Sequence, residues 1–185
     1  MKLIYIKIVK KKQRNLIIAL IIIAFIAGII VLNLQGFSNT SSSSKAIDFE
    51  LPLIDANGLT GSSLRLSDYK GKVILLEFAV EWCPHCQKMT SVIKQINQDF
   101  QNKGVVVVTV MLSVNTDVYK TALFIRTYNS NWLHVYDING EVMNKYGVTA
   151  TPTYFIIDKN FNIVDKFQGE NSYDYIASKL MKYLS

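Results

Sequence analysis

The two cysteines of this 185-residue chain are separated by two residues, in the sequence Cys83-Pro84-His85-Cys86. Two thiols at this spacing can close an intramolecular disulfide and reopen it by thiol–disulfide exchange. Because the chain has no third cysteine, a framework of structural disulfides is excluded. The pair therefore predicts a redox centre that exchanges disulfides through Cys83 and Cys86.

The surrounding pattern predicts that the pair lies between a buried strand and a helix. Residues 73–80 are apolar except for Glu77, as is typical of a central strand. From Met89 onward, apolar residues recur at intervals of three and four, which indicates an amphipathic helix. Pro84 suits the first position of such a helix, because its missing N–H is not needed there.

This placement assigns different roles to the two thiols. Cys83 falls at the start of the helix, where free N–H groups and the helix dipole favour a thiolate. A protonated His85 would add a second positive influence and make the disulfide a stronger oxidant. We therefore expect Cys83 to be the exposed attacking thiol and Cys86, one turn further along, to be the buried resolving thiol.

Half of a zinc site is the structural alternative for a Cys-x-x-Cys pair. Zinc needs two further ligands, and the chain offers only His85 and His134. His85 lies between the cysteines, where it could join their coordination sphere only under strain. His134 lies in the apolar run 132–136 and is typical of an ordinary strand histidine. No metal site and no bound cofactor are predicted.

The remaining segments of the domain alternate between strand and helix patterns. Strands are expected at 105–114, 153–157 and 163–168, and helices at 117–128, at 140–146 and at the C-terminal end. The last two strands flank Asp158-Lys159-Asn160, which indicates a hairpin turn. This order predicts an α/β fold built on a right-handed crossover.

Residues 47–185 resemble the TlpA/ResA-like branch of the thioredoxin superfamily. The resemblance rests on Cys-Pro-His-Cys, preceded by Glu81-Trp82, and on further motifs. These are residues 48–53 (DFELPL), 55–58 (DANG), 66–72 (LSDYKGK), 146–148 (YGV), 151–153 (TPT) and 157–158 (ID). The resemblance implies a thioredoxin-like fold, with a central mixed sheet flanked by helices, and no bound cofactor.

The same resemblance implies roles for residues outside the cysteine pair. Pro152 matches the family's cis-proline, which packs beside the disulfide and, with Thr151, leaves backbone free to pair with a substrate strand. Trp82 is expected to shield the disulfide and contact substrate, or else to pack as an ordinary aromatic. Glu77 matches the family's buried acid, which has a raised pKa and could take a proton from Cys86. Its alternative is a solvated edge residue.

The resemblance implies exchange with protein thiols and disulfides but leaves the redox direction open. The scaffold is similar to that of reducing members, among whose processes is cytochrome c maturation, whereas the Pro-His dipeptide is similar to that of the bacterial disulfide-forming oxidase. Two further classes remain as alternatives. Peroxide reduction would require a Thr where Val80 stands, together with an arginine. Copper delivery would require three residues between the cysteines, together with a distant histidine.

The N-terminal segment predicts a membrane anchor. Residues 16–34 contain no charge and as a helix would be about 28 Å long, close to the thickness of the bilayer core. Six basic residues precede this stretch, so the positive-inside rule places residues 1–15 in the cytoplasm and the catalytic domain outside it. A cleaved signal peptide and a buried core helix are the alternatives.

The charge outside this tail argues against nucleic acid as a partner. The net charge is +6, and the six basic residues of the tail account for all of it. A neutral domain lacks the electrostatic footprint of a phosphate-binding protein. Residues 35–46 then read as a Ser-rich linker. Asn39 begins a glycosylation acceptor pattern of a kind that arises easily by chance in such a stretch.

The predicted topology also bears on the redox partner. A tethered extracytoplasmic thiol pair needs a second protein to restore its oxidation state after each turnover. We expect a membrane redox partner, either a quinone-linked oxidase or a reductant that transfers thiols. The predicted location is the cell membrane, with a single pass through residues 16–34.

Overall fold

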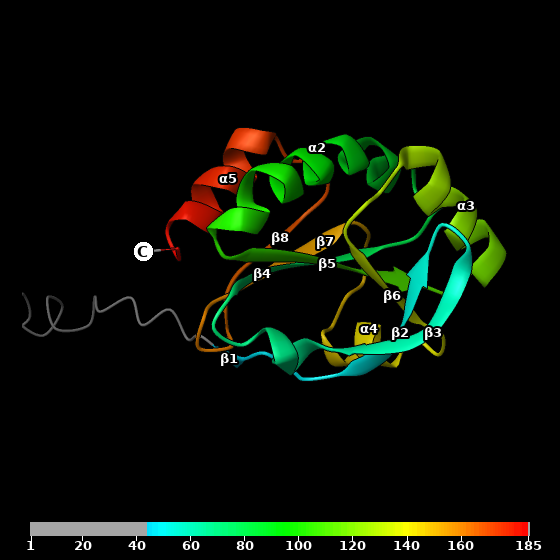
Figure 1. The fold of residues 1–185 in the computed structure, drawn as a ribbon, viewed down its shortest axis with the longest axis horizontal. Coiled ribbons are helices and arrows are strands. Elements are labelled where there is room, and N and C mark those ends of the chain that lie inside the picture. Colours follow the sequence, from blue (N-terminus) through cyan, green and yellow to red (C-terminus); the bar gives the residue numbers. More distant parts are fainter. Residues whose placement is uncertain (1–43, 185) are drawn as a thin grey trace, which may run out of the picture. The chain divides into compact units, whose positions relative to one another are not determined.

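The fold is a twisted mixed sheet covered by helices on both faces (Figure 1). A computed structural model describes residues 44–184, and within them eight strands pair in the order β1-β8-β7-β4-β5-β6-β2-β3. In chain order the strands are β1 (Ser44–Lys45), β2 (Glu50–Asp55), β3 (Gly58–Arg65), β4 (Val73–Ala79), β5 (Val105–Leu112), β6 (Leu133–Asp137), β7 (Thr153–Ile157) and β8 (Asn162–Gln168). Strands β4, β5 and β6 are parallel, and the other pairings are antiparallel.

The sheet separates two core layers, and helices cover both. Helices α2 (Pro84–Phe100) and α5 (Tyr173–Met181) cover one face of the sheet, and the short α4 (Glu141–Lys145) lies on the other (Figure 1). Helix α3 (Val118–Tyr128) packs against the β2–β3 hairpin. Alternate residues of β4 therefore enter different layers, with Leu75 packing beneath α2 and Leu76 in the opposite layer.

The expected elements around the cysteines are present. Helix α2 begins at Pro84 with Cys83 as its N-cap residue, as the sequence predicts. The parallel pairing of β4 with β5, joined through α2, is the expected crossover. The turn at 158–160 joins β7 to β8, and α3 begins after Asp117. These observations confirm the thioredoxin-like fold class for the described residues.

Two features differ from the sequence-based expectations. Strands β2 and β3 form a hairpin that the pattern did not indicate. The expected linker 35–46 also ends earlier than predicted, because Ser44 and Lys45 pair with β8 and Ala46 is buried in the core. The basic tail 1–15, the proposed anchor 16–34 and the rest of the linker lie outside the described residues.

None of the helices within residues 44–184 combines the length and apolarity needed to cross a bilayer.

Candidate active site

The redox pair lies where the central strand passes into the first turn of α2. The backbone N–H of Cys83 donates to the Val80 carbonyl at 3.2 Å, and the Cys83 carbonyl accepts from the N–H of Gln87 at 3.0 Å. The Gln87 side-chain amide also donates to the Glu81 carbonyl at 2.8 Å. The loop is thus fixed to the helix it precedes, which holds both sulfurs at the helix N-terminus.

Both cysteines are free thiols, and both are largely covered. Cys83 is 5% exposed and Cys86 is 2% exposed. The expectation of a freely exposed Cys83 is therefore wrong. The cover comes from a distant part of the chain, because the Cys83 Sγ lies 3.4 Å from the carbonyl oxygen of Thr151. The Thr151–Pro152 peptide bond is cis, as the family resemblance implied.

The environment separates the acidities of the two thiols. Partial burial alone would raise the pKa of Cys83, but hydrogen bonds from Thr151 and from the backbone of Cys86 and His85 outweigh it and lower that pKa. Burial, followed by the charge of Glu77, raises the pKa of Cys86 far above its ordinary value. The pair therefore combines a thiolate-forming Cys83 with a Cys86 that stays protonated.

A row of buried polar residues crosses the sheet beneath α2. Glu77 of β4 is in register with Thr109 of β5 and Tyr154 of β7, and Thr109 is in register with His134 of β6. The Thr109 hydroxyl donates to Glu77 Oε2 at 2.7 Å and accepts from Trp132 Nε1 at 2.8 Å. Glu77 is thus a buried acid and not an edge residue.

Burial sets the protonation of this row. It raises the pKa of Glu77 to about 6, against the lowering effect of the hydrogen bond from Thr109. The same cause lowers the pKa of His134 to about 4, so this histidine is neutral near pH 7. Its Nδ1 lies 2.9 Å from the Trp132 carbonyl, consistent with an ordinary strand histidine.

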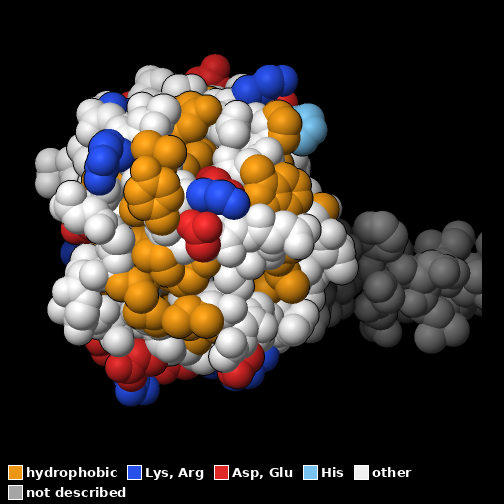
Figure 2. Space-filling model, turned by 90° about the vertical axis from the view of Figure 1, so that its right-hand side faces the viewer, with side chains coloured by type: hydrophobic (Ala, Val, Ile, Leu, Met, Phe, Trp, Pro, Cys, Tyr) orange, Lys and Arg blue, Asp and Glu red, His pale blue; other side chains and the backbone are white. Residues whose placement is uncertain are grey.

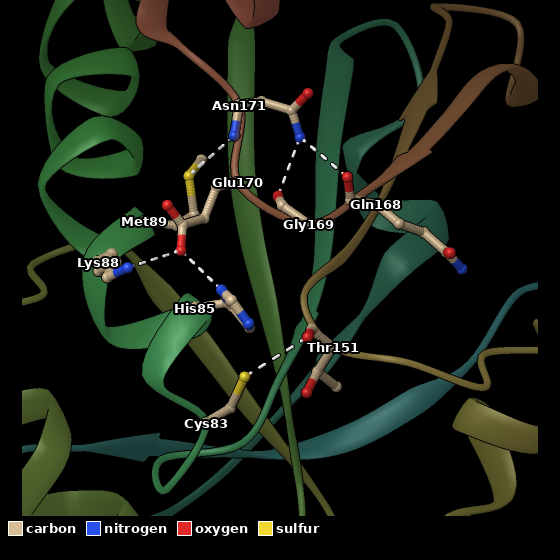
Figure 3. Close-up of polar contacts among 9 residues, drawn as sticks. All are labelled: Cys83, His85, Lys88, Met89, Thr151, Gln168, Gly169, Glu170 and Asn171. Atoms are coloured by element: carbon tan, nitrogen blue, oxygen red, sulfur yellow. Dashed lines mark hydrogen bonds and ion pairs between the residues drawn. The ribbon is translucent and has the colours of Figure 1, made fainter.

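His85 contacts an acidic side chain that no sequence motif indicates. Its Nδ1 lies 2.6 Å from Oε1 of Glu170, and Nζ of Lys88 lies 3.1 Å from the same oxygen (Figure 3). All three side chains are substantially exposed. Glu170 lies 85 residues from His85 along the chain, so no local spacing could have indicated the contact.

An apolar groove of about 520 Å³ runs beside the thiols. It is lined by Val80, Trp82, Leu112, Val114, Met143, Val148, Thr149, Ala150 and Thr151. Trp82 is 51% exposed, and its Nε1 donates to the Val114 carbonyl at 2.8 Å. Figure 2 shows hydrophobic side chains gathered over the end of the molecule that lies at the right in Figure 1. Trp82 and Thr151 thus line one groove, whereas His85 is not part of its wall.

The part of the chain that the structure describes holds no group of three or more His, Cys, Asp or Glu side chains placed to share a metal ion. A zinc site built on Cys83 and Cys86 would therefore lack a third His, Cys, Asp or Glu ligand among residues 44–184. His134, the second candidate ligand, is buried in β6, and its Nδ1 contacts the Trp132 carbonyl.

Known thiol–disulfide oxidoreductases are similar to this chain in sequence and fold. The thiol-disulfide oxidoreductase ResA of Bacillus thuringiensis subsp. konkukian is 26% identical over 171 residues, which cover 92% of this chain and 98% of ResA. A crystal structure of a thiol:disulfide interchange protein DsbE from Chlorobium tepidum superposes with a TM-score of 0.70 at 26% identity, covering 77% of this chain and 97% of that one.

A second solved structure is the exposed lipoprotein thioredoxin Etrx1 of Streptococcus pneumoniae. It matches with a TM-score of 0.64 at 27% identity and covers 74% of this chain and 99% of its own. Residues 43–166, most of the described domain, match the AhpC/TSA family. With a thioredoxin-like sheet and a cysteine pair at the start of α2, the chain belongs to the AhpC/TSA family of the thioredoxin superfamily.

Proposed function

We propose that this thiol–disulfide oxidoreductase exchanges disulfides with protein substrates outside the cytoplasm while tethered to the membrane by residues 16–34. The observation that carries the exchange chemistry is the unequal acidity of the two thiols. A pair with one thiolate and one protonated thiol can attack in one step and resolve in the next. The ResA and DsbE names of similar proteins support the same reaction class.

The reductive half-reaction follows from this asymmetry. The Cys83 thiolate attacks one sulfur of a substrate disulfide, which forms a mixed disulfide and releases a substrate thiolate. Cys86 then loses its proton and attacks Cys83 Sγ, which closes the Cys83–Cys86 disulfide and releases the second substrate thiol. Two electrons pass from the protein to the substrate. The oxidative direction runs these steps in reverse, and a membrane redox partner resets the pair.

The buried carboxylate supports the second step. Cys86 cannot attack while it is protonated, and burial opposes the loss of its proton. Glu77 has a pKa of about 6 and influences Cys86 electrostatically, so it is placed to receive that proton. During closure of the disulfide the proton then stays on Glu77, and the negative charge leaves with the substrate sulfur, which takes a proton from solvent.

The groove supports a polypeptide as the substrate. Its wall is mostly apolar, and the Thr151 carbonyl at its end is positioned beside the Cys83 sulfur. An extended substrate strand could donate an N–H to that carbonyl while an apolar side chain fills the groove. The disulfide of an apoprotein in cytochrome c maturation is one such substrate for the reductive direction.

Peroxide reduction is not favoured by the described side chains. Arg65 pairs with Glu50, and Arg126 donates to the Ala56 carbonyl, so neither of these two arginines is free to polarise a peroxide at Cys83. Val80 stands where a peroxidatic site would have Thr. Copper delivery is not favoured either, because only two residues separate the cysteines and that class has three between them. A spectroscopic copper titration run beside a dithiol assay separates binding from catalysis.

Trapping of mixed disulfides tests the proposal directly. Cys86→Ser should accumulate mixed disulfides, visible as larger species on non-reducing gels, because the resolving thiol is missing. The matched variant Cys83→Ser should trap nothing and should abolish exchange, because Cys86 is the more buried thiol with the raised pKa. Trapping by Cys83→Ser alone would reverse the roles, and trapping by neither variant would remove the proposed function.

A further inference from the structure

The loop between β8 and α5 brings a carboxylate against the helix turn that carries the redox pair. The first turn of α2 has no acidic residue of its own. Glu170 reaches it from this loop, and its Oε1 contacts both His85 and Lys88 (Figure 3). In the same view Cys83 lies on the other side of His85. His85 and Lys88 of α2 therefore share one carboxylate partner.

The loop that holds Glu170 is itself fastened to both halves of the site. The N–H of Gly169 donates to the Pro152 carbonyl at 2.9 Å, next to the carbonyl that contacts Cys83. The N–H of Asn171 lies 3.3 Å from Sδ of Met89 in α2. The Asn171 side-chain amide donates to the carbonyls of Gln168 and Gly169 at 3.2 and 2.9 Å (Figure 3). Glu170 is thus placed between two anchored residues.

We propose that Glu170 is a positioning residue that lowers the oxidising power of the Cys83–Cys86 pair by pairing with Lys88 and with the protonated form of His85. This inference rests on the proposed thiol–disulfide exchange. A positive group near Cys83 stabilises the thiolate and hence the reduced form, which makes the disulfide a stronger oxidant. A carboxylate bound to those groups opposes that effect and repels the thiolate.

The contacts also affect Glu170 itself. Hydrogen bonding from His85 and then from Lys88 holds the pKa of Glu170 below its ordinary value, so the carboxylate is ionised throughout the neutral range. A Pro-His dipeptide alone favours an oxidising pair. With Glu170 present, a cysteine pair with the same dipeptide can be less oxidising. An oxidase-like Pro-His dipeptide is then compatible with a scaffold similar to that of reducing proteins.

Equilibration with glutathione tests this role in the full-length protein. The measured reaction converts the protein disulfide and two glutathione molecules into the protein dithiol and one glutathione disulfide. Glu170→Gln should move its equilibrium constant about two- to five-fold toward the dithiol, the range expected for an exposed ion pair. Lys88→Gln should move it toward the disulfide. Glu141→Gln, the same change at an exposed site on α4, should leave it unchanged.

Two further readouts distinguish an electrostatic role from a structural one. Thiolate absorbance should report a lower pKa for Cys83 in Glu170→Gln. The shift in the equilibrium constant should shrink in about 1 M salt, where the Debye length is about 3 Å. An unchanged constant, a shift toward the disulfide or a salt-independent shift in Glu170→Gln would overturn the inference. Failure of the wild-type protein to equilibrate with glutathione would instead remove the proposed function on which it rests.

Discussion

At the scale of single residues, the chemistry depends on groups that meet only after folding. The cysteine spacing and the strand that carries Glu77 are visible in the sequence, so both could be predicted from it. The cover over Cys83 could not, because it comes from Thr151, 68 residues further along the chain. Glu170 was missed for the same reason. A charged residue in a loop has no pattern that reveals which distant side chain it will contact.

Burial of Glu77 makes the stability of the protein depend on pH. The folded-state pKa, about 6, lies above the ordinary 4.5, so the folded protein holds this proton more tightly than the unfolded chain. The contribution is fully favourable below 4.5 and is lost as the pH rises through 6. Above that range the buried charge costs about 2 kcal/mol relative to the protonated acid.

Glu77→Gln should remove this dependence because an amide cannot ionise. Urea unfolding at about pH 4 and about pH 8 should show the stability of the variant relative to wild type rising by about 2 kcal/mol between the two conditions. Glu141→Gln provides the control, since this exposed carboxylate lies on α4. An equal difference at both pH values would contradict a raised pKa at Glu77.

At the scale of elements, regular patterns were predictable and irregular ones were not. Strand β4 and helix α2 have the strong apolar periodicity that reveals a buried strand and an amphipathic helix. The β2–β3 hairpin lacks it, because β2 contains Pro52 and β3 is polar and largely exposed. Its pairing is set by contact with β6 and α3, which the local sequence does not encode.

Helix α3 offers a direct test of local capping. The Asp117 carboxylate accepts a hydrogen bond from the N–H of Lys120 at 2.8 Å, which satisfies one of the free amides of the first turn. Asp117→Ala should lower the free energy of unfolding by about 1 kcal/mol, measured by urea denaturation. Asp117→Ser keeps a capping oxygen and should lose much less. Equal losses in both variants would show that the cap does not stabilise α3.

At the scale of the whole molecule, the proposed topology places the thiols outside the cytoplasm. A membrane-impermeant thiol reagent applied to intact cells after mild reduction should label Cys83, because six basic residues precede the apolar stretch 16–34. The double variant Cys83→Ser, Cys86→Ser gives the background, since the chain has no other cysteine. Labelling that appears only after lysis would overturn the proposed location.

Strand β1 pairs at the end of β8 that is remote from the thiols. Ser44 and Lys45 pair with the first residues of β8, whereas Gly169, just past the other end of that strand, donates to Pro152 beside Cys83. The seven residues of β8 separate these points by roughly 20 Å. A bulky substrate can therefore reach Cys83 without passing the end of the sheet at which β1 pairs.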